Sequence, residues 1–187
     1  GWASTPENEL PEKMPRDTVR FCVAVHNKAA GGDANHQPGG GEGGNNTACG
    51  NSVDFNMLCR TPDNRTDVDG YEHNLKNNVA YKGGKLIANF DPSKCDATHN
   101  SFDMNLDLND SDFASVDESE LTKPRQSNGD LPQIRFLRPS PTSRLIDRGV
   151  DIGFRFRGKT PDLGAFERSE EDGHRDTKST ENERGND

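Results

Sequence analysis

With 187 residues the chain is long enough for one domain with a buried core, yet only 28% of its residues are hydrophobic and its mean hydropathy is −1.02. A typical globular domain is nearer half apolar, so the composition excludes a conventional hydrophobic core. The formal charge of −9 argues against nucleic acid as a partner, because phosphate binding needs a basic face, and no apolar run has the length of a membrane span.

The chain opens on a proline-containing segment, residues 1–17, which predicts an N-terminal loop. No signal peptide is visible in it. We therefore expect any secretion signal to have been removed or to lie upstream.

Residues 18–90 carry an imperfect repeat centred on Ala24, Ala48 and Ala80, at intervals of 24 and 32 residues. Each alanine lies in a short run of small or apolar residues that is followed by a turn-forming stretch. A spacing in the twenties is typical of one coil of a parallel β-solenoid. The sequence therefore predicts an all-β fold, a right-handed parallel β-helix with its coils in residues 18–90. The polar run 60–69 falls in the longer interval and predicts a loop inserted into one coil.

Two asparagines occupy equivalent places in this repeat, Asn46 and Asn78. Asparagines one coil apart can bond to each other and to the turn backbone, forming an internal ladder. Such a ladder would help to stabilise a chain with few hydrophobic residues. The alternative is coincidence in an asparagine-rich sequence.

Beyond the repeat, residues 91–167 predict the C-terminal strands and a cap. Apolar and polar residues alternate over 102–108, a period-two pattern that indicates a strand. A short strand or turn is predicted at 112–116, and another short strand candidate follows at 134–137.

Two turn-rich stretches, residues 145–149 and 161–167, end this region, the second with a turn and a last strand. A solenoid needs a cover for its final coil, and these stretches are expected to provide it. The almost wholly polar residues 168–187 predict a solvated, mobile tail.

The four cysteines show neither a CxxC pair nor zinc-ligand spacing. Buried free thiols are favoured over disulfides, since cysteine is often buried as a small hydrophobic residue. The residues concerned are Cys22, Cys49, Cys59 and Cys95.

Three stretches resemble one family of enzymes, and their sequences are NKAAGGDANHQPG (27–39), NNTA (45–48) and LKNNVAY (75–81). The chain resembles polysaccharide lyase family 9, the bacterial pectate and rhamnogalacturonan lyases. The resemblance extends to the cap stretches, but those are shared by many extracellular β-helix proteins and support the fold more than the activity.

The resemblance implies a lyase that cleaves an acidic plant cell-wall polysaccharide, rhamnogalacturonan or polygalacturonate, by β-elimination. In the family a Ca²⁺ ion neutralises the uronate carboxylate and a neutral lysine removes the acidified proton. Calcium would also bridge the acidic protein and its acidic substrate. A secreted, periplasmic or cell-surface monomer is expected.

The sequence departs from the family pattern in three respects. The family's catalytic lysine lies in a Gly-Phe-Lys motif that would fall just before Gly1, and most coils and calcium-binding aspartates would also lie upstream. Gly32 stands where a phenylalanine is expected, and glycines replace an apolar strand within residues 40–44. We therefore expect the chain to represent the C-terminal part of the β-helix and to have little activity alone.

Candidate substrate-binding residues lie in the first matching stretch and in the inserted loop. Asp33, Asn35 and His36 could line the substrate groove, or Asp33 and Asn35 could instead cap a turn. The sequence identifies no carboxylate partner for His36. Arg60 and Arg65 are candidates because arginine binds carboxylates through paired hydrogen bonds.

Other charged residues favour simpler readings. Lys28 and Lys82 follow strands and could contact a uronate carboxylate, but a solvated lysine in a turn is the more common case and is favoured for both. Asp103, Asn105 and Asp107 imitate the start of an EF-hand loop, but the required glycine and glutamate are missing. The metal ligands are thus not identified.

Two other functions fit the same sequence. The first is a non-catalytic glycan-binding or structural β-helix module, which would bind without forming product. The second is a fragment of a bacterial surface adhesin, which would bind protein instead.

Overall fold

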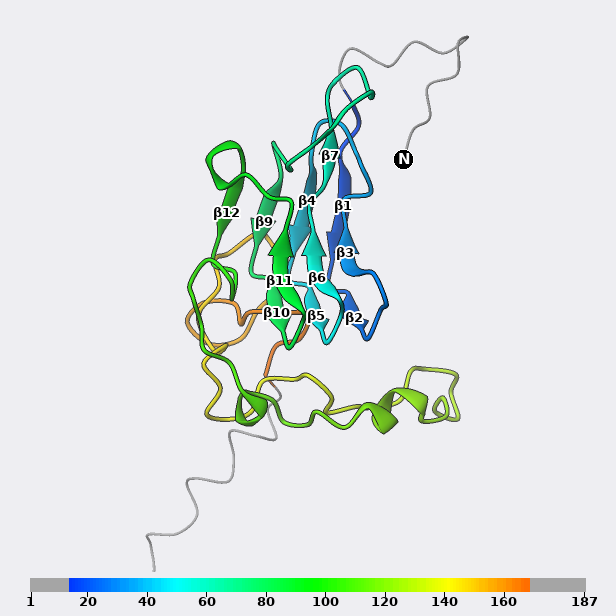
Figure 1. The fold of residues 1–187 in the computed structure, drawn as a ribbon. Coiled ribbons are helices and arrows are strands. Elements are labelled where there is room, and N and C mark those ends of the chain that lie inside the picture. Colours follow the sequence, from blue (N-terminus) through cyan, green and yellow to red (C-terminus); the bar gives the residue numbers. More distant parts are fainter. Residues whose placement is uncertain (1–13, 169–187) are drawn as a thin grey trace, which may run out of the picture.

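The computed structural model describes residues 14–168, and these fold into stacked coils of short strands (Figure 1). Sheet A contains β1 (Asp17–Arg20), β4 (Gly41–Gly44), β9 (Asn74–Lys76) and β12 (Asp96–Thr98). Sheet B contains β2 (Val23–Val25), β5 (Thr47–Cys49) and β10 (Val79–Tyr81). Sheet C contains β3 (Ala30–Asp33), β6 (Val53–Asn56) and β11 (Lys85–Ala88).

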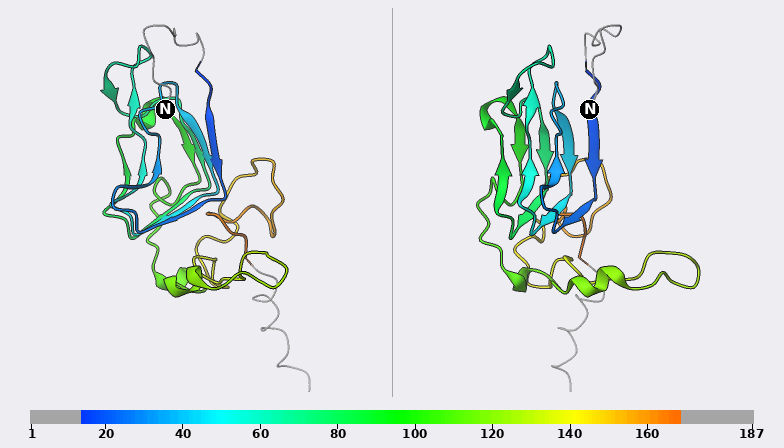
Figure 2. Two further views of the ribbon diagram at one scale, coloured as in Figure 1. Left: turned by 90° about the vertical axis from the view of Figure 1, so that its right-hand side faces the viewer. Right: turned by 45° about the vertical axis from the view of Figure 1, so that its right-hand side comes forward.

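All pairing within these three sheets is parallel, and each strand pairs with its equivalent one coil away. The left view of Figure 2 looks along the stack and shows the sheets as the sides of one coil. Ala24 pairs with Ala48, and Ala48 pairs with Ala80. The predicted parallel β-helix and the register of its alanines are therefore confirmed.

The asparagine ladder is also confirmed, and it is longer than predicted. Asn46 Nδ2 donates to Asn78 Oδ1 at 2.9 Å, and Asn78 Nδ2 donates to Asn100 Oδ1 at 2.8 Å. In the first coil Cys22 takes the equivalent place, and its backbone N–H donates to Asn46 Oδ1. The ladder thus satisfies buried polar groups at the corner between sheets A and B.

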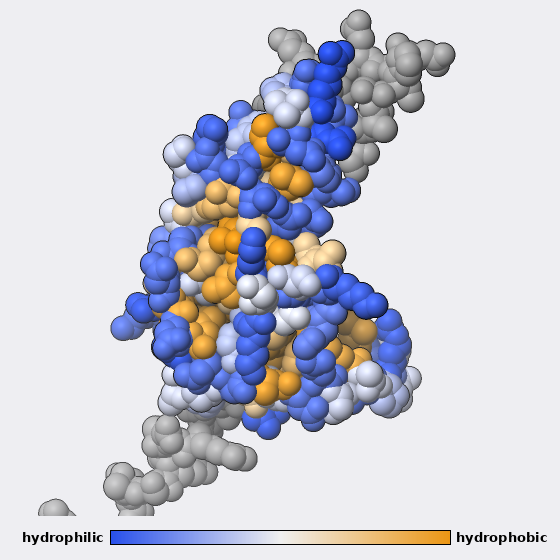
Figure 3. All heavy atoms as spheres, viewed as in Figure 1, coloured by the Kyte–Doolittle hydropathy of each residue, from blue (hydrophilic) through white to orange (hydrophobic). Residues whose placement is uncertain are grey.

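The scarce hydrophobic residues form two cores, one on each side of sheet B. The inner core fills the coils and includes Ala48, Phe55, Met57, Leu75 and Ala80. The outer core joins sheet B to the C-terminal segment and includes Cys49, Val79, Tyr81, Phe113, Phe136, Leu137, Leu145 and Leu163. Figure 3 shows mostly hydrophilic side chains on one face, with apolar patches between them.

Glycine does not prevent strand formation where an apolar strand was expected. Gly41–Gly44 forms β4, which pairs with both β1 and β9. A side chain at Gly32 would approach Phe55 Cδ1 to 2.9 Å, and one at Gly43 would approach Leu75 Cδ2 to 3.0 Å. The side chains of Phe55 and Leu75 in the neighbouring coils therefore fill the space beside these two glycines.

The polar run predicted as an inserted loop forms a hairpin. Strands β7 (Cys59–Arg60) and β8 (Asp67–Val68) pair antiparallel, with Arg60 opposite Asp67. The insertion is therefore a β-hairpin with a defined register, in which Arg60 lies opposite Asp67.

The strand predicted over residues 102–108 is wrong, since no strand forms there. The N–H groups of Met104 and Leu106 instead donate to the carbonyls of Asn100 and Ser101, which folds the segment into turns. Its apolar residues still become partly buried: Phe102 packs on the inner core, while Met104, Leu106 and Leu108 pack on the outer one.

The two later strand candidates form only isolated bridges, Phe113 with Pro139 and Ser115 with Phe136. Three short 3-10 helices complete the elements: η1 (Pro92–Lys94), η2 (Asp110–Asp112) and η3 (Glu118–Thr122). η3 lies in an arm below the coils (Figure 1). No helix in the part of the chain that the structure describes is long and apolar enough to cross a membrane.

The stretches 145–149 and 161–167 cover the side of the coils, and no strand forms in the second. Gly164 N–H donates to the Asn77 carbonyl, and Ala165 N–H donates to Thr47 Oγ1. Leu145 and Leu163, buried apolar residues of these two stretches, pack on the outward face of sheet B. The two stretches therefore cover sheet B and not the last coil. Of the predicted tail, only Arg168 lies within the described residues.

All four cysteines are free thiols, but only Cys49 and Cys59 are fully buried. Burial and the nearby Asp54 carboxylate raise the pKa of Cys49 to about 11. Cys22 is exposed at the first coil, so the prediction of buried thiols holds for half of the set.

Candidate substrate-binding site

Two of the predicted site residues meet at a carboxylate on the β7–β8 hairpin. Arg60 Nε donates to Asp67 Oδ1 at 2.9 Å, and His36 Nδ1 lies 2.9 Å from the same oxygen. Because an ionised carboxylate only accepts hydrogen bonds, His36 Nδ1 must carry a proton in this contact. The arrangement holds an arginine and a histidine side by side on a partly exposed surface.

The charge of Asp67 is stabilised by its two partners. Hydrogen bonds from Arg60 and then from His36 hold the pKa of Asp67 below its usual range. The carboxylate therefore remains ionised at neutral pH and orients both donors. We refer to His36, Arg60 and Asp67 as the hairpin cluster.

Asp33 lies at the end of β3 and makes two contacts through one oxygen. Asp33 Oδ1 accepts from the Asn35 backbone N–H at 2.8 Å and from Asn56 Nδ2 at 3.2 Å. Asn56 Oδ1 in turn accepts from Asn89 Nδ2 at 2.7 Å. The turn-capping contact weighed for Asp33 is therefore present, and it begins a polar row across three coils.

Arg65 is not part of the hairpin cluster. Its side chain is 83% exposed, and its Nε lies 3.9 Å from Asp63 Oδ2 in the same loop. The structure thus joins Arg60 with His36 and separates Arg65 from both.

The partner of His36 was missed because it is 31 residues away in the sequence. Only the antiparallel pairing of β7 with β8 places Asp67 opposite Arg60 and beside the turn that holds His36. One signal was usable, namely an aspartate near the far end of the polar run that contains Arg60.

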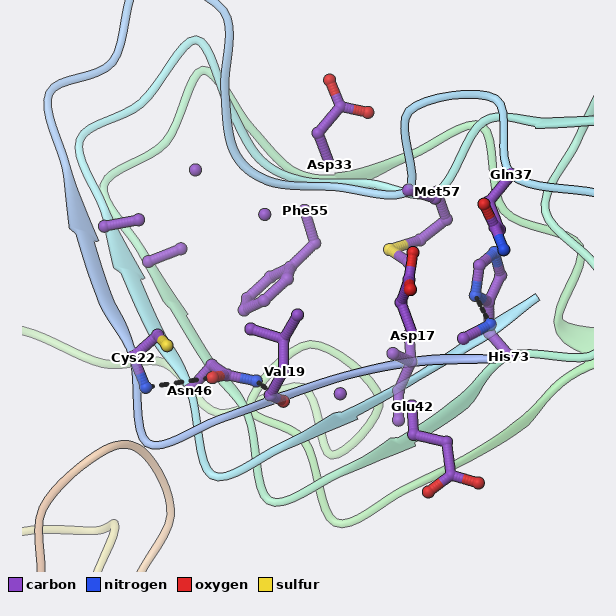
Figure 4. Close-up of a pocket in the computed structure, with 18 of the residues that line it drawn as sticks. Asp17, Val19, Cys22, Asp33, Gln37, Glu42, Asn46, Phe55, Met57 and His73 are labelled. Atoms are coloured by element: carbon purple, nitrogen blue, oxygen red, sulfur yellow. Dashed lines mark hydrogen bonds between the residues drawn. The ribbon is translucent and has the colours of Figure 1, made fainter. Parts of the chain in front are cut away.

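An apolar hollow opens inside the first coil, with a volume of about 180 Å³. Val19, Phe55, Met57 and Leu75 line it, together with glycines of β3 and β4. In Figure 4, Asp33 and Glu42 point away from this hollow, whereas the Asp17 carboxylate points into it beside Met57. The charged group that faces the hollow is therefore acidic and would repel a uronate.

A buried thiol and imidazole also lie together, but their protonation does not favour nucleophilic chemistry. Gly41 N–H donates to His73 Nδ1 at 2.9 Å, which leaves the proton of the neutral ring on Nε2. Nε2 lies 3.2 Å from Cys59 Sγ and so faces the thiol as a donor. Burial lowers the pKa of His73 and raises that of Cys59, and both changes favour neutral groups.

Residues 14–168 contain no group of three or more His, Cys, Asp and Glu side chains placed to hold a metal ion. Asp103, which begins the EF-hand-like pattern, instead accepts hydrogen bonds from the backbone and side chain of Asn100. The side chains of these residues therefore do not fit the Ca²⁺ site that the family resemblance implies.

No family model matches the chain. Searches of known proteins and of solved structures both find lyases. Pectate lyase L of Dickeya chrysanthemi is 34% identical over 152 residues, which cover 81% of this chain and 33% of that protein. Pectate lyase L of Dickeya dadantii gives the same values. The chain is similar in sequence to the pectate lyases. It spans about a third of the length of these curated relatives.

Two solved structures extend the relationship. Pectate lyase Pel9A matches with a TM-score of 0.70 and 30% identity, over 82% of this chain and 36% of that one. A rhamnogalacturonan lyase matches with a TM-score of 0.63 and 36% identity, over 67% of this chain and 31% of that one. The predicted resemblance to the pectate and rhamnogalacturonan lyases is therefore confirmed in both sequence and fold.

Proposed function

We propose that this chain supplies C-terminal β-helix coils of a pectin-degrading lyase and that its hairpin cluster binds the acidic glycan. The observation that carries the proposal is the meeting of Arg60 and His36 at Asp67, in a chain related to pectate lyases. The substrate would be rhamnogalacturonan or polygalacturonate, cleaved by β-elimination. Such an enzyme would act outside the cytoplasm, where plant cell-wall polysaccharide is found.

The chemistry of the cluster suits a uronate. Arginine presents several N–H donors in a planar fork that matches a carboxylate. Arg60 uses its Nε on Asp67, and its side chain is 38% exposed. His36 Nδ1 is also held by Asp67, with a 37% exposed side chain. Because Asp67 fixes both donors before the glycan arrives, less conformational entropy is lost on binding.

The catalytic base and the calcium site are proposed to lie outside the described residues. A lysine base needs a lowered pKa, whereas the hydrogen bonds that Lys82 and Lys94 donate to Asp110 and Asp91 raise the pKa values of these lysines. When bound, calcium would neutralise the uronate carboxylate. We propose that the intact enzyme requires calcium and that this chain contributes substrate contacts.

The chain alone is expected to form unsaturated uronide at less than about one-thousandth of the rate of a full-length relative, since a general base contributes roughly 10²- to 10⁴-fold. The measurement is the ultraviolet absorbance of the product on polygalacturonate and on rhamnogalacturonan, with calcium present. Robust turnover by the chain would show that the base lies within it.

Replacing Arg60 with glutamine is expected to weaken binding of oligogalacturonide about five- to tenfold, because a partly exposed charge-assisted hydrogen bond contributes roughly 1 kcal/mol. Arg65→Gln is the matched control, since it removes the same charge from the same hairpin outside the cluster. Titration calorimetry with both variants measures the difference. Equal losses in the two variants would contradict the proposed role of the cluster.

The second candidate is a non-catalytic glycan-binding module. It would need only the two donors held at Asp67, Arg60 Nε and His36 Nδ1, and no metal ion. Glycan binding that a chelator does not change, without any product, would support this candidate over the lyase. A requirement for calcium in binding would support the lyase.

A further inference from the structure

Residues 148–159 form a basic loop on an otherwise acidic protein. The chain has 32 acidic and 23 basic residues, yet this loop holds four basic residues and a single acid, Asp151. All four basic residues are exposed: Arg148, Arg155, Arg157 and Lys159. The charge of this segment is therefore opposite to that of the whole chain.

The fold anchors this loop against the outer face of sheet A. A side chain at Gly44 would lie 2.9 Å from Ile152 Cδ1, so the glycine makes room for the loop. Asn77 binds both the N–H and the carbonyl of Val150, each at 2.8 Å. In the left view of Figure 2 the loop stands beside β1 and outside the coil.

At its other end the loop is held through its backbone. Lys159 N–H donates to Asp147 Oδ1 at 2.7 Å, and Arg157 N–H donates to Glu167 Oε2 at 3.2 Å. Arg155 forms no ion pair with any residue between 14 and 168. The anchors use backbone N–H groups and leave the Arg155 guanidinium without an ion pair among these residues, whereas the Lys159 charge contributes to the lowered pKa of Asp147.

An exposed aromatic pair lies at the foot of the loop. The rings of Phe21 and Phe154 meet edge to face with centroids 5.1 Å apart, although the two residues are 45% and 42% exposed. The Arg20 guanidinium lies 5.2 Å from the Phe154 ring centroid. Within residues 14–168 nearly half of each residue of this pair is exposed.

Phe21 also has an unfavourable backbone conformation. Its φ is 55°, and the equivalent corner in the next two coils is occupied by Asn45 and Asn77, with φ of 51° and 59°. Asparagine tolerates this left-handed region, whereas a bulky aromatic residue rarely adopts it. The position thus presents an aromatic ring at the surface where local preference favours asparagine.

Arg20 is already paired with Glu42, since its Nη2 donates to Glu42 Oε2 at 3.1 Å. We propose that this loop, together with Phe21, is a second binding site for an acidic, uronate-containing glycan. The aromatic rings offer apolar faces to the C–H faces of sugar rings, and the arginines bind carboxylates. A glycan fits better than nucleic acid because the basic area is small and the rest of the protein is acidic. The choice of a uronate rests on the proposed function.

The site is separate from the hairpin cluster. The cluster follows β3 and β6 of sheet C, whereas the loop packs on sheet A at its corner with sheet B. A polysaccharide long enough to reach both would bind more tightly than to either alone, because the second contact is intramolecular.

The test is affinity electrophoresis of the whole chain in gels containing polygalacturonate. Arg155→Gln/Lys159→Gln is expected to weaken binding at least fivefold, and Phe154→Ala two- to threefold. The charge-matched control is Arg125→Gln/Arg135→Gln, which removes two exposed arginines elsewhere and should leave binding within twofold. A neutral polysaccharide should not retard the wild-type chain.

The outcomes separate the two proposals. If Arg60→Gln weakens binding and Arg155→Gln/Lys159→Gln does not, the second site is wrong while the proposed function stands. If both double variants lose binding equally, or if duplex DNA binds as tightly as polygalacturonate, the loop is only a non-specific polyanion contact and the proposal is overturned. If no uronate polymer binds the wild-type chain, both proposals fail.

Discussion

Asn78→Ala is expected to lower the free energy of unfolding by about 3 kcal/mol or more, because it interrupts the ladder at its centre and each buried group left unpaired costs roughly 1–3 kcal/mol. Asn78 is fully buried. Its Oδ1 accepts from both the backbone and the side chain of Asn46, and its Nδ2 donates to the Gly43 carbonyl. Alanine would leave the Asn46 N–H and the Gly43 carbonyl without these partners.

Urea unfolding followed by far-ultraviolet circular dichroism measures this loss. Asn27→Ala is the control, since Asn27 is exposed and its side chain makes one hydrogen bond, to Asn51 Oδ1. It should cost less than about 1 kcal/mol. Similar losses in the two variants would mean that the ladder contributes no more than a surface contact.

Asp112→Asn is expected to lower the free energy of unfolding by about 2 kcal/mol. Asp112 is buried and accepts hydrogen bonds from Arg144 Nε and Nη2 at 3.0 and 2.6 Å. Losing one partner of a buried pair costs roughly 3–5 kcal/mol, and partial exposure of Arg144 reduces that figure. The pair holds η2 against the C-terminal segment, so its loss should loosen the outer core.

This effect should depend on pH in a defined direction. Burial alone raises the pKa of Asp112, but the hydrogen bonds from Arg144 outweigh it and lower the pKa below its usual value. The stability due to the charge is therefore fully present above the unfolded pKa, about 3.9, and is lost as pH falls through the lower folded pKa.

Unfolding of Asp112→Asn and of the wild type at several pH values tests this dependence. The difference between them should be constant above about pH 5 and should shrink below pH 4. Asp117→Ala, at the exposed N-cap of η3, is the control and should cost less than about 1 kcal/mol. A difference that stays constant down to pH 2 would contradict the assigned role of the Asp112 charge.

The sequence by itself determined the coils. The equivalent positions of Ala24, Ala48 and Ala80 predicted the register of sheet B, because a solenoid places residues one coil apart directly above each other. The same logic identified Asn46 and Asn78 as ladder residues. Asn100 was missed because the coil that contains it lacks the alanine motif.

Tertiary structure alone decided the hairpin cluster and the ends of the fold. Asp67 reaches His36 only through the pairing of β7 with β8, and no local pattern encodes that contact. The alternation over residues 102–108 predicted a strand, but turns bring its apolar residues to two cores at once. A repeat can be recognised in a sequence because its contacts recur at a similar spacing. A contact made once between distant segments leaves no such pattern and is seen only in the folded structure.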